Sequence, residues 1–260
     1  MLAKEGVALL NKKKAHGAKS VDMQKIIGDN TAFAVKEAFN ALCANVLYLP
    51  ISDSCKKIAL TSAVPGEGKS YISINLAITL ANTLIDKKIL LIDMDMRSPS
   101  VRKLFNNVDG EYNTKVGLSD YLVGLTDKPN IIPTEVPGLS ILFSGNEIVS
   151  PAGLISSVKM TKLIEDCEKE YDYIIIDTPP VSVVSDATLL VGRVNGYILS
   201  TRAEYSSVNS LANAEKILEA VNAPILGVVL TDYNPKKSKH HSGYGSKKYY
   251  YYDYYAYGKK

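Results

Sequence analysis

The chain has 260 residues, of which 46% are hydrophobic and 22% are charged, and its formal net charge is +3. This composition is typical of a globular chain with one large core or two small ones. Its three cysteines, Cys43, Cys55 and Cys167, lack C-x-x-C spacing, which argues against a disulfide framework and a cysteine zinc site. No apolar run approaches the roughly 20 residues of a membrane helix, and no secretory signal pattern opens the chain, so we expect a soluble cytoplasmic protein.

The charge is unevenly distributed along the chain. From Pro235 onward, seven lysines stand against Asp253 alone, which gives this segment +6 and leaves the remainder at −3. A mildly acidic body with a basic tail argues against a nucleic-acid-binding body.

The first 47 residues are predicted to form an arm and a helix. Residues 1–30 are of mixed composition and include three consecutive lysines at 12–14, so we expect a flexible arm. Over residues 31–47, apolar side chains recur at helical spacing and predict an amphipathic helix. These side chains are Phe33, Val35, Ala38, Phe39, Leu42 and Val46. The helix would open a single domain that we place at 31–234.

The next segment has the pattern of a phosphate-binding loop. A strand-like run at 58–62 leads into AVPGEGKS at 63–70, and a helical run follows to residue 83. The pattern G/A-x-x-x-x-G-K-S/T needs this strand–loop–helix context, because the loop points backbone N–H groups at phosphate oxygens and the helix N-terminus adds its dipole. We therefore predict a nucleotide site made by Pro65, Gly66, Glu67, Gly68, Lys69, Ser70 and Tyr71. Lys69 would reach the β- and γ-phosphates, and Ser70 would bind Mg²⁺.

Strands and helices alternate along the rest of the domain. Continuously apolar runs at 88–93, 173–177, 196–200 and 225–230, and a shorter one at 139–143, indicate strands buried on both faces. Helical runs lie between them at 151–170, 186–192 and 206–221. This alternation predicts an α/β fold of the P-loop NTPase class, with a mostly parallel sheet covered by helices on both faces.

Three carboxylates stand at predicted strand ends. Asp93, Asp95 and Asp177 should converge near the phosphate-binding loop, because ligands of an open parallel sheet bind beyond the carboxyl ends of its strands. Asp177 is the natural Walker B acid, and of Asp93 and Asp95 one could reach metal and the other an attacking hydroxyl. Arg97 could bind phosphate or pair with these carboxylates, and a structural salt bridge is an equally good role for a lone arginine. For Asp186 we favour the role of a helix cap.

The last residues form a tyrosine cluster. Segment 235–260 lacks apolar periodicity, so we expect it to be disordered. Such tails can be sticky linkers or nucleic-acid stacking segments, but beside a nucleotide site the tyrosines become candidate phosphate acceptors. The candidates are Tyr249, Tyr250, Tyr251, Tyr252, Tyr254, Tyr255 and Tyr257.

Together these motifs resemble those of the bacterial tyrosine kinases, the cytoplasmic partners of capsule and exopolysaccharide co-polymerases. The resemblance rests on TSAVPGEGKS at 61–70, LIDMDMR at 91–97, IIDTPP at 175–180 and the tyrosine tail, and extends to 143–157 and 181–187. It covers about residues 31–260.

The resemblance implies an ATP- and Mg²⁺-dependent kinase. It assigns phosphate and metal binding to Lys69 and Ser70, activation of the tyrosine hydroxyl to Asp93, and metal binding to Asp95 and Asp177. It also implies phosphorylation of the tail in trans between subunits, regulation of polysaccharide synthesis and export, and a cognate tyrosine phosphatase. A transmembrane adaptor would recruit the chain to the inner face of the membrane.

Two positions depart from the family pattern. The family's E-x-x-R-x-x-R helix, used in ring-shaped oligomers, here has Glu37 but Asn40 and Cys43 in place of both arginines. An arginine fork is not replaced by such side chains, so ring assembly by that ion-pair route is in question. Thr231 stands where the family usually has asparagine, and adenine contacts would differ there.

Two other functions remain open. Partitioning and septum-site ATPases share the fold, but they carry a lysine early in the loop where this chain has Val64. Many also end in an amphipathic membrane helix, which the tyrosine tail cannot form. A nucleotide-gated scaffold without catalysis is the second alternative, and the intact set of Lys69 and the three aspartates argues against it.

Overall fold

The computed structural model describes residues 26–28, 31–105 and 115–233. Most of the predicted arm and the whole tail, with its candidate phosphate acceptors, lie outside these ranges. The domain boundaries proposed from the sequence therefore stay predictions. In the described ranges, no helix combines the length and the apolar character needed to cross a bilayer.

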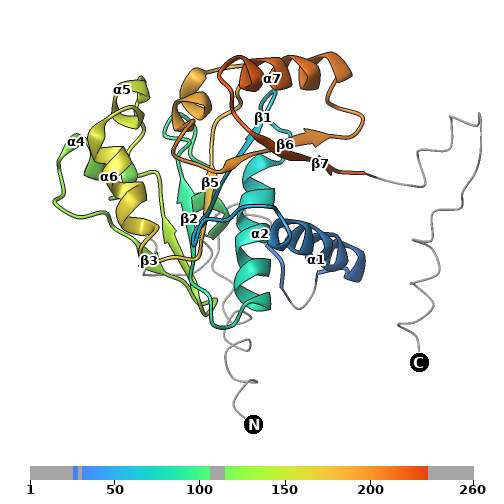
Figure 1. The fold of residues 1–260 in the computed structure, drawn as a ribbon, viewed down its shortest axis with the longest axis horizontal. Coiled ribbons are helices and arrows are strands. Elements are labelled where there is room, and N and C mark those ends of the chain that lie inside the picture. Colours follow the sequence, from blue (N-terminus) through green and yellow to red (C-terminus); the bar gives the residue numbers. More distant parts are fainter. Residues whose placement is uncertain (1–25, 29–30, 106–114, 234–260) are drawn as a thin grey trace, which may run out of the picture.

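A seven-stranded sheet forms the centre of the molecule (Figure 1), with the strand order β3-β4-β2-β5-β1-β6-β7. All neighbouring strands are parallel except β3 and β4, which are antiparallel. The predicted mostly parallel sheet is thus confirmed. The strands are β1 (Lys56–Ser62), β2 (Ile89–Asp93), β3 (Ile132–Pro133), β4 (Leu139–Leu142), β5 (Tyr173–Asp177), β6 (Gly196–Arg202) and β7 (Ile225–Thr231).

Helices cover both faces of this sheet. Figure 1 shows α1 and α2 on one side and α4, α5 and α6 on the other. The helices are α1 (Phe33–Leu47), α2 (Lys69–Thr83), α3 (Val101–Phe105), α4 (Leu118–Val123), α5 (Ala152–Ile155), α6 (Val158–Cys167), the 3₁₀ helix η3 (Ser185–Leu190) and α7 (Val208–Ala220). Residues of α1, α2 and α3 pack in one core, and residues of α4 to α7 pack in the other.

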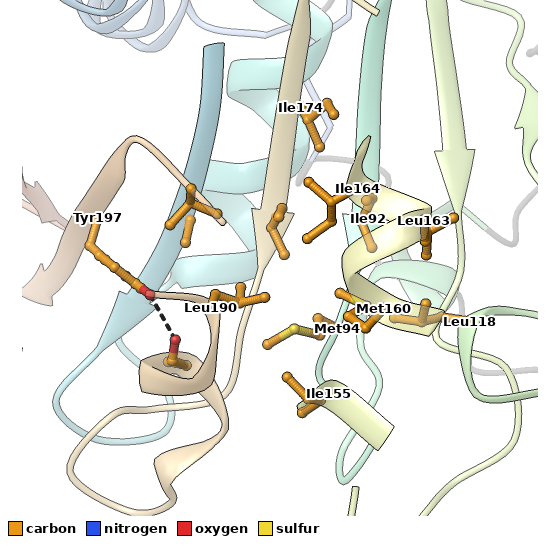
Figure 2. Packing of buried hydrophobic residues seen from close by; sticks show 14 of the residues in the cluster. Ile92, Met94, Leu118, Ile155, Met160, Leu163, Ile164, Ile174, Leu190 and Tyr197 are labelled. Carbon is orange, nitrogen blue, oxygen red and sulfur yellow. Dashed lines mark hydrogen bonds between the residues drawn. The ribbon is translucent and has the colours of Figure 1, made fainter. Parts of the chain in front are cut away.

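The core beneath α5 and α6 shows how the layers are joined (Figure 2). Met160, Leu163 and Ile164 of α6 pack over Ile92 and Ile174 of the two neighbouring strands. In the same core the hydroxyl of the buried Tyr197 donates to the carbonyl oxygen of Ala187, 2.9 Å away. A phenol on β6 thereby fastens η3 to the sheet, since a buried hydroxyl needs a partner.

Several helices and strands in the structure differ from those predicted from the sequence. The helical run at 151–170 is broken into α5 and α6, because Ser157 caps the second helix by accepting from Met160 N. The run at 186–192 is a 3₁₀ helix at Ser185–Leu190. The helices α3 and α4 and the short strand β3 had no predicted counterpart. For α4 the sequence did carry a signal, since the Asp120 carboxylate accepts from Gly117 N and Gly124 ends the helix at φ +94°.

The amphipathic helix before β1 is confirmed, but its buried face differs in part. Phe39, Cys43 and Val46 are buried, whereas Phe33 is 54% exposed. Cys43 packs in the core with 2% exposure. Cys43 therefore lies in the core that α1 shares with α2. Asn40 is exposed, and its amide donates to Glu37 of the same helix at 2.9 Å.

Candidate active site

The strand register brings two of the predicted carboxylates together. Asp93 ends β2, Asp177 ends β5, and the two residues are direct partners in the parallel ladder. Both side chains are fully buried. Asp95 follows two residues beyond β2 and is only 3% exposed. The three aspartates therefore lie together at the carboxyl edge of the sheet, as predicted. We call Asp93, Asp95 and Asp177 the carboxylate cluster.

The phosphate-binding loop lies between β1 and α2. Gly66 and Gly68 take φ angles of +84° and +87°, which a residue with a Cβ adopts only at a cost. Gly68 is also the N-cap of α2, whose first residue is Lys69. The first backbone N–H groups of the helix therefore face the loop, as an anion site requires.

Lys69 crosses the loop to the carboxylate cluster. Its Nζ lies 3.0 Å from Asp95 Oδ2, and the two side chains are 12% and 4% exposed. The other oxygen of Asp95 accepts from Ser98 N at 3.0 Å. Burial works to lower the pKa of Lys69, but the attraction of Asp177 and Asp95 outweighs it and raises this pKa. Lys69 therefore stays an ammonium group at neutral pH.

A chain of hydroxyl groups leads from the loop to Asp177. Ser70 donates to Asp177 Oδ2 at 2.5 Å, and Ser100 donates to the Ser70 oxygen at 2.8 Å. On the other side of the carboxylate, the Ser73 hydroxyl lies 3.0 Å from Asp177 Oδ1. The sequence analysis did not find Ser73 or Ser100. A signal for Ser73 existed: it stands three residues after Ser70, on the same face of the helix.

The carboxylate cluster holds more negative charge than its surroundings compensate. Burial, and then the charges of Asp177 and Asp95, raise the pKa of Asp93 well above its ordinary value. Burial also raises the pKa of Asp177, against the opposing effects of Lys69 and the Ser70 hydroxyl. In the described part of the chain, Asp93 Oδ2 has no hydrogen-bond partner, although it is buried. Such a group marks a place where a further ligand fits.

These residues fit a magnesium ion that shares its ligands with a nucleotide. One hydroxyl (Ser70) and neighbouring carboxylate oxygens are hard ligands, and the orphaned Asp93 oxygen and the excess negative charge favour a divalent cation. Among the described residues, no group of three or more His, Cys, Asp or Glu side chains forms a metal cage of its own. Mg²⁺ does not need one, because it keeps several waters and is commonly held by one or two carboxylates plus substrate phosphates.

Arg97 and Asp186 form an ion pair with each other. The guanidinium group forms a bidentate pair with Asp186, with Nε and Nη2 at 2.7 Å and 3.0 Å from the two carboxylate oxygens. Arg97 thus forms a structural salt bridge, one of the roles considered from the sequence, and its partner is Asp186 instead of the carboxylate cluster. The cap prediction for Asp186 is also wrong, because Val184 is the N-cap of η3 and no side chain caps it.

Two predicted nucleotide-binding side chains point elsewhere. Tyr71 packs edge-on against Phe39 of α1, with ring centroids 5.6 Å apart, so the part of Tyr71 available to a phosphate is its backbone N–H. Glu67 is 1% exposed and accepts from Val64 N at 2.9 Å within the loop. Its other carboxyl oxygen accepts from the Ser206 hydroxyl.

The arrangement combines three chemical capacities at one edge of the sheet. The loop N–H groups and Lys69 can hold phosphate oxygens. Ser70 and the carboxylate cluster can hold a divalent cation. Asp93, with its raised pKa, can accept a proton from a hydroxyl group in front of the loop. The site is therefore suited to phosphoryl transfer.

Comparisons with known proteins agree with this chemistry. A family model described as ParA, NUBPL iron-transfer P-loop NTPase, matches residues 54–246. Tyrosine-protein kinase CpsD of Streptococcus agalactiae is 36% identical over 200 residues, which cover 76% of this chain and 83% of CpsD. The kinase domain of Escherichia coli tyrosine kinase ETK superposes with a TM-score of 0.75 at 27% identity, over 89% of this chain and 88% of that domain.

The septum-site relatives share the fold at lower similarity. The septum site-determining protein MinD of Pyrococcus horikoshii, solved with Mg-ADP, is 23% identical with a TM-score of 0.54, over 68% of this chain and 70% of that chain. Such a likeness supports the common P-loop fold. It carries no argument about the reaction.

Proposed function

This chain is a ParA-type P-loop NTPase that belongs to the bacterial tyrosine kinase family, and on this premise we propose that it is an active protein-tyrosine kinase. It would transfer the γ-phosphoryl group of ATP to tyrosines of its own tail at 249–252, 254, 255 and 257. The observation that carries the proposal is the carboxylate cluster beside Lys69. A protein that only sensed nucleotide would need ligands for Mg²⁺, such as Ser70 and Asp177, but no further carboxylate to take a proton from an acceptor hydroxyl.

We assign the binding steps to the loop and to Lys69. In the structure the Lys69 ammonium is paired with Asp95. Phosphate oxygens compete for this ammonium, so nucleotide binding would exchange the Asp95 pair for a phosphate contact. Asp95 is thereby released to act together with Ser70 and Asp177. Bound Mg²⁺ would neutralise the phosphate charge that develops during the transfer.

We assign the proton transfer to Asp93. The tyrosine oxygen forms a bond to the γ-phosphorus, the bond from that phosphorus to the β-bridging oxygen breaks, and ADP leaves. The phenolic proton passes to the Asp93 carboxylate, whose pKa is raised by burial and by its two acidic neighbours. A raised pKa makes a carboxylate a better proton acceptor at neutral pH.

The partners are part of the proposal. We infer a domain at 31–234, a tail acting as substrate in trans, and a transmembrane co-polymerase adaptor that recruits the chain to the inner face of the membrane. Regulation of capsule or exopolysaccharide synthesis follows from the same family membership. Because Asn40 bonds to its own helix and Cys43 is buried, any ring would be held by contacts other than an arginine fork at these two positions.

The test is autophosphorylation of the purified chain. Incubation with Mg-ATP, with and without the cytoplasmic segment of the adaptor, is followed by phosphopeptide mapping of the tail. We expect phosphotyrosine within 249–257. ATP hydrolysis without phosphotyrosine in both conditions would contradict the kinase proposal and favour the ATPase alternative.

A loop variant provides the control. Lys69→Met removes the ammonium group that contacts the phosphates, so phosphotyrosine should fall by at least about 100-fold, as for other electrostatic contacts to the reacting groups. Lys87→Met is the matched control, because Lys87 lies on the surface and pairs with Asp172 away from the loop. Equal activity of Lys69→Met and the wild type would show that the assignment of Lys69 is wrong.

A further inference from the structure

Side chains of β6, of β7 and of the loop between β6 and α7 form hydrogen bonds with the outer side of the phosphate-binding loop. The Glu67 carbonyl oxygen accepts from Ser200 at 2.5 Å and from Thr231 at 3.0 Å. The Pro65 carbonyl oxygen accepts from the Tyr205 hydroxyl at 3.1 Å. The Glu67 side chain links Val64 N to Ser206. We call Glu67, Ser200, Tyr205, Ser206 and Thr231 the loop brace.

The loop brace fixes which way the peptide groups of the loop point. A peptide group that turns its carbonyl outward turns its N–H toward the opposite side, where a phosphate would lie. Hydroxyl groups draw two loop carbonyls outward, those of Pro65 and Glu67. Without such partners, these carbonyls could rotate into the loop and present negative charge to the phosphates. The hydroxyls therefore favour the phosphate-binding conformation before any ligand arrives.

Glu67 is the central residue of the brace. Its carboxyl group reaches back three residues to Val64 N, as the glutamate of a capping box does, and so closes the turn that contains Gly66. The same group fastens that turn to Ser206 in the loop between β6 and α7. A buried carboxyl group with partners on both oxygens is costly to rearrange, which makes it a rigid support.

From this geometry we propose that Glu67 and Ser206 are positioning residues, which hold the loop in its phosphate-binding form and couple it to the loop between β6 and α7. They act through the backbone and do not touch the reacting atoms. The inference rests on the proposed function, because it requires the loop to bind nucleotide phosphate. It assigns Glu67 a role distinct from the nucleotide contact predicted from the sequence.

The variant Glu67→Gln removes the charge of the side chain but keeps its size and its two hydrogen bonds. In Glu67→Gln, the amide oxygen can still accept from Val64 N, and the amide nitrogen can donate to Ser206. The Ser206 oxygen already accepts from Arg202 N at 2.9 Å and has a second lone pair for this bond. Glu67→Ala removes both links and leaves the Val64 N–H without its partner.

The experiment measures Mg-ADP affinity by titration calorimetry and Tm without nucleotide, for the same set of proteins. We expect Mg-ADP binding to weaken by about 10-fold or more in Glu67→Ala and by about 3-fold or more in Ser206→Ala, while Glu67→Gln stays within about 3-fold of wild type. In kinase assays the first two variants should raise KM for ATP more than they lower kcat.

Ser207→Ala is the matched control. Ser207 is adjacent in sequence but caps α7, accepting from Ser210 N at 3.0 Å. Its loss should lower Tm while the affinity for Mg-ADP stays within about 2-fold of wild type. A brace residue with a merely structural role would behave in the same way.

The outcomes separate this inference from the proposed function. Wild-type affinity in Glu67→Ala and Ser206→Ala, with a lowered Tm, would overturn the positioning role and leave the kinase proposal intact. If Glu67→Ala does not fold, Ser206→Ala alone decides, and affinity within about 3-fold of wild type overturns the inference. A wild-type chain that binds no Mg-ADP would overturn the inference and the proposed function together.

Discussion

The two sides of the phosphate-binding loop differ in how completely their polar groups are paired. On the side of β6 and β7, the loop brace gives every oxygen of Glu67 a hydrogen-bond donor. On the side of β2 and β5, Asp95 alone of the three buried carboxylates has a salt bridge, and Asp93 keeps an oxygen without a partner in the described structure. The hydrogen bonds on the first side stabilise the conformation of the loop. The carboxylates on the second side are left with an oxygen that a bound ligand can satisfy.

This difference separates stability from function within a single site. Groups that complete their hydrogen bonds inside the protein stabilise the fold and have little left to offer a substrate. Groups that are buried without compensation destabilise the free protein, and a cation, a nucleotide or a proton can supply what they lack. Variants on the two sides should therefore change stability in opposite directions.

The largest effect is expected for Asp93→Asn. The variant keeps the size of the side chain but cannot accept the phenolic proton, so tail phosphorylation should fall by about 100-fold to 10,000-fold. Because a like charge is removed from the carboxylate cluster, the free energy of unfolding without ligand should rise by about 1 kcal/mol. Single-turnover phosphorylation and urea unfolding measure the two effects. A variant that is less stable than the wild type would contradict the contrast between the two sides.

A smaller effect is expected when a paired carboxylate loses its partner. Arg97→Ala would leave the fully buried Asp186 without its bidentate ion pair and should cost about 2 to 3 kcal/mol of stability. The exposed pair of Lys169 and Asp166 is the control, since Lys169→Ala should cost under about 0.5 kcal/mol. Urea unfolding of both variants tests this.

The same variant distinguishes the two roles considered for Arg97. If Arg97 only pairs with Asp186, then activity per folded molecule should survive in Arg97→Ala at a temperature where the variant is folded. A stable Arg97→Ala protein without phosphotransfer would instead indicate a contact with phosphate.

The smallest effect is a change of stability with pH. Because Asp93 and Asp177 have raised pKa values in the folded state, the folded protein binds protons more tightly than the unfolded chain. Their contribution to stability is therefore present at low pH and is lost as the pH rises from the ordinary value of 3.8 through the raised values. Each group contributes a slope of at most about 1.4 kcal/mol per pH unit.

The measurement compares wild type with Asp93→Asn, without nucleotide or Mg²⁺, across a pH series. Titrating groups outside the carboxylate cluster cancel in the difference between the two proteins, so the difference reports on Asp93 and on the carboxylates that interact with it. The stability advantage of Asp93→Asn should grow as the pH rises through the raised pKa. An advantage that is independent of pH would mean that Asp93 titrates alike in the folded and the unfolded chain.

Local patterns sufficed for one side of the site and failed for the other. Gly66, Gly68, Lys69 and Ser70 are contiguous, and the aspartates end apolar strands, so motif and strand patterns located them. The brace partner Ser206 carries no motif, and Thr231 stood out only as a departure from the family's asparagine, because a serine or threonine near a strand end is common in any sequence. Their role depends on which strand lies at the edge next to the loop, and the strand order is a property of the tertiary fold.

The prediction for Asp186 failed for a related reason. An aspartate at the start of a helical run is a frequent cap, and the local pattern favours that interpretation. The partner that decides its role is Arg97, 89 residues earlier in the chain. The ion pair forms because both segments leave the same edge of the sheet.

The sequence distances within the loop brace also bear on when the site can work during synthesis. Ser206 and Thr231 follow Glu67 by 139 and 164 residues. At about 5 to 20 residues per second, a ribosome needs on the order of 10 to 30 seconds to make that stretch. A nascent chain thus exposes the complete AVPGEGKS motif long before the last strand can hold it in shape. If the brace preorganises the loop, the chain gains full affinity for nucleotide only when the edge of its sheet is finished, which delays phosphotransfer by unfinished copies.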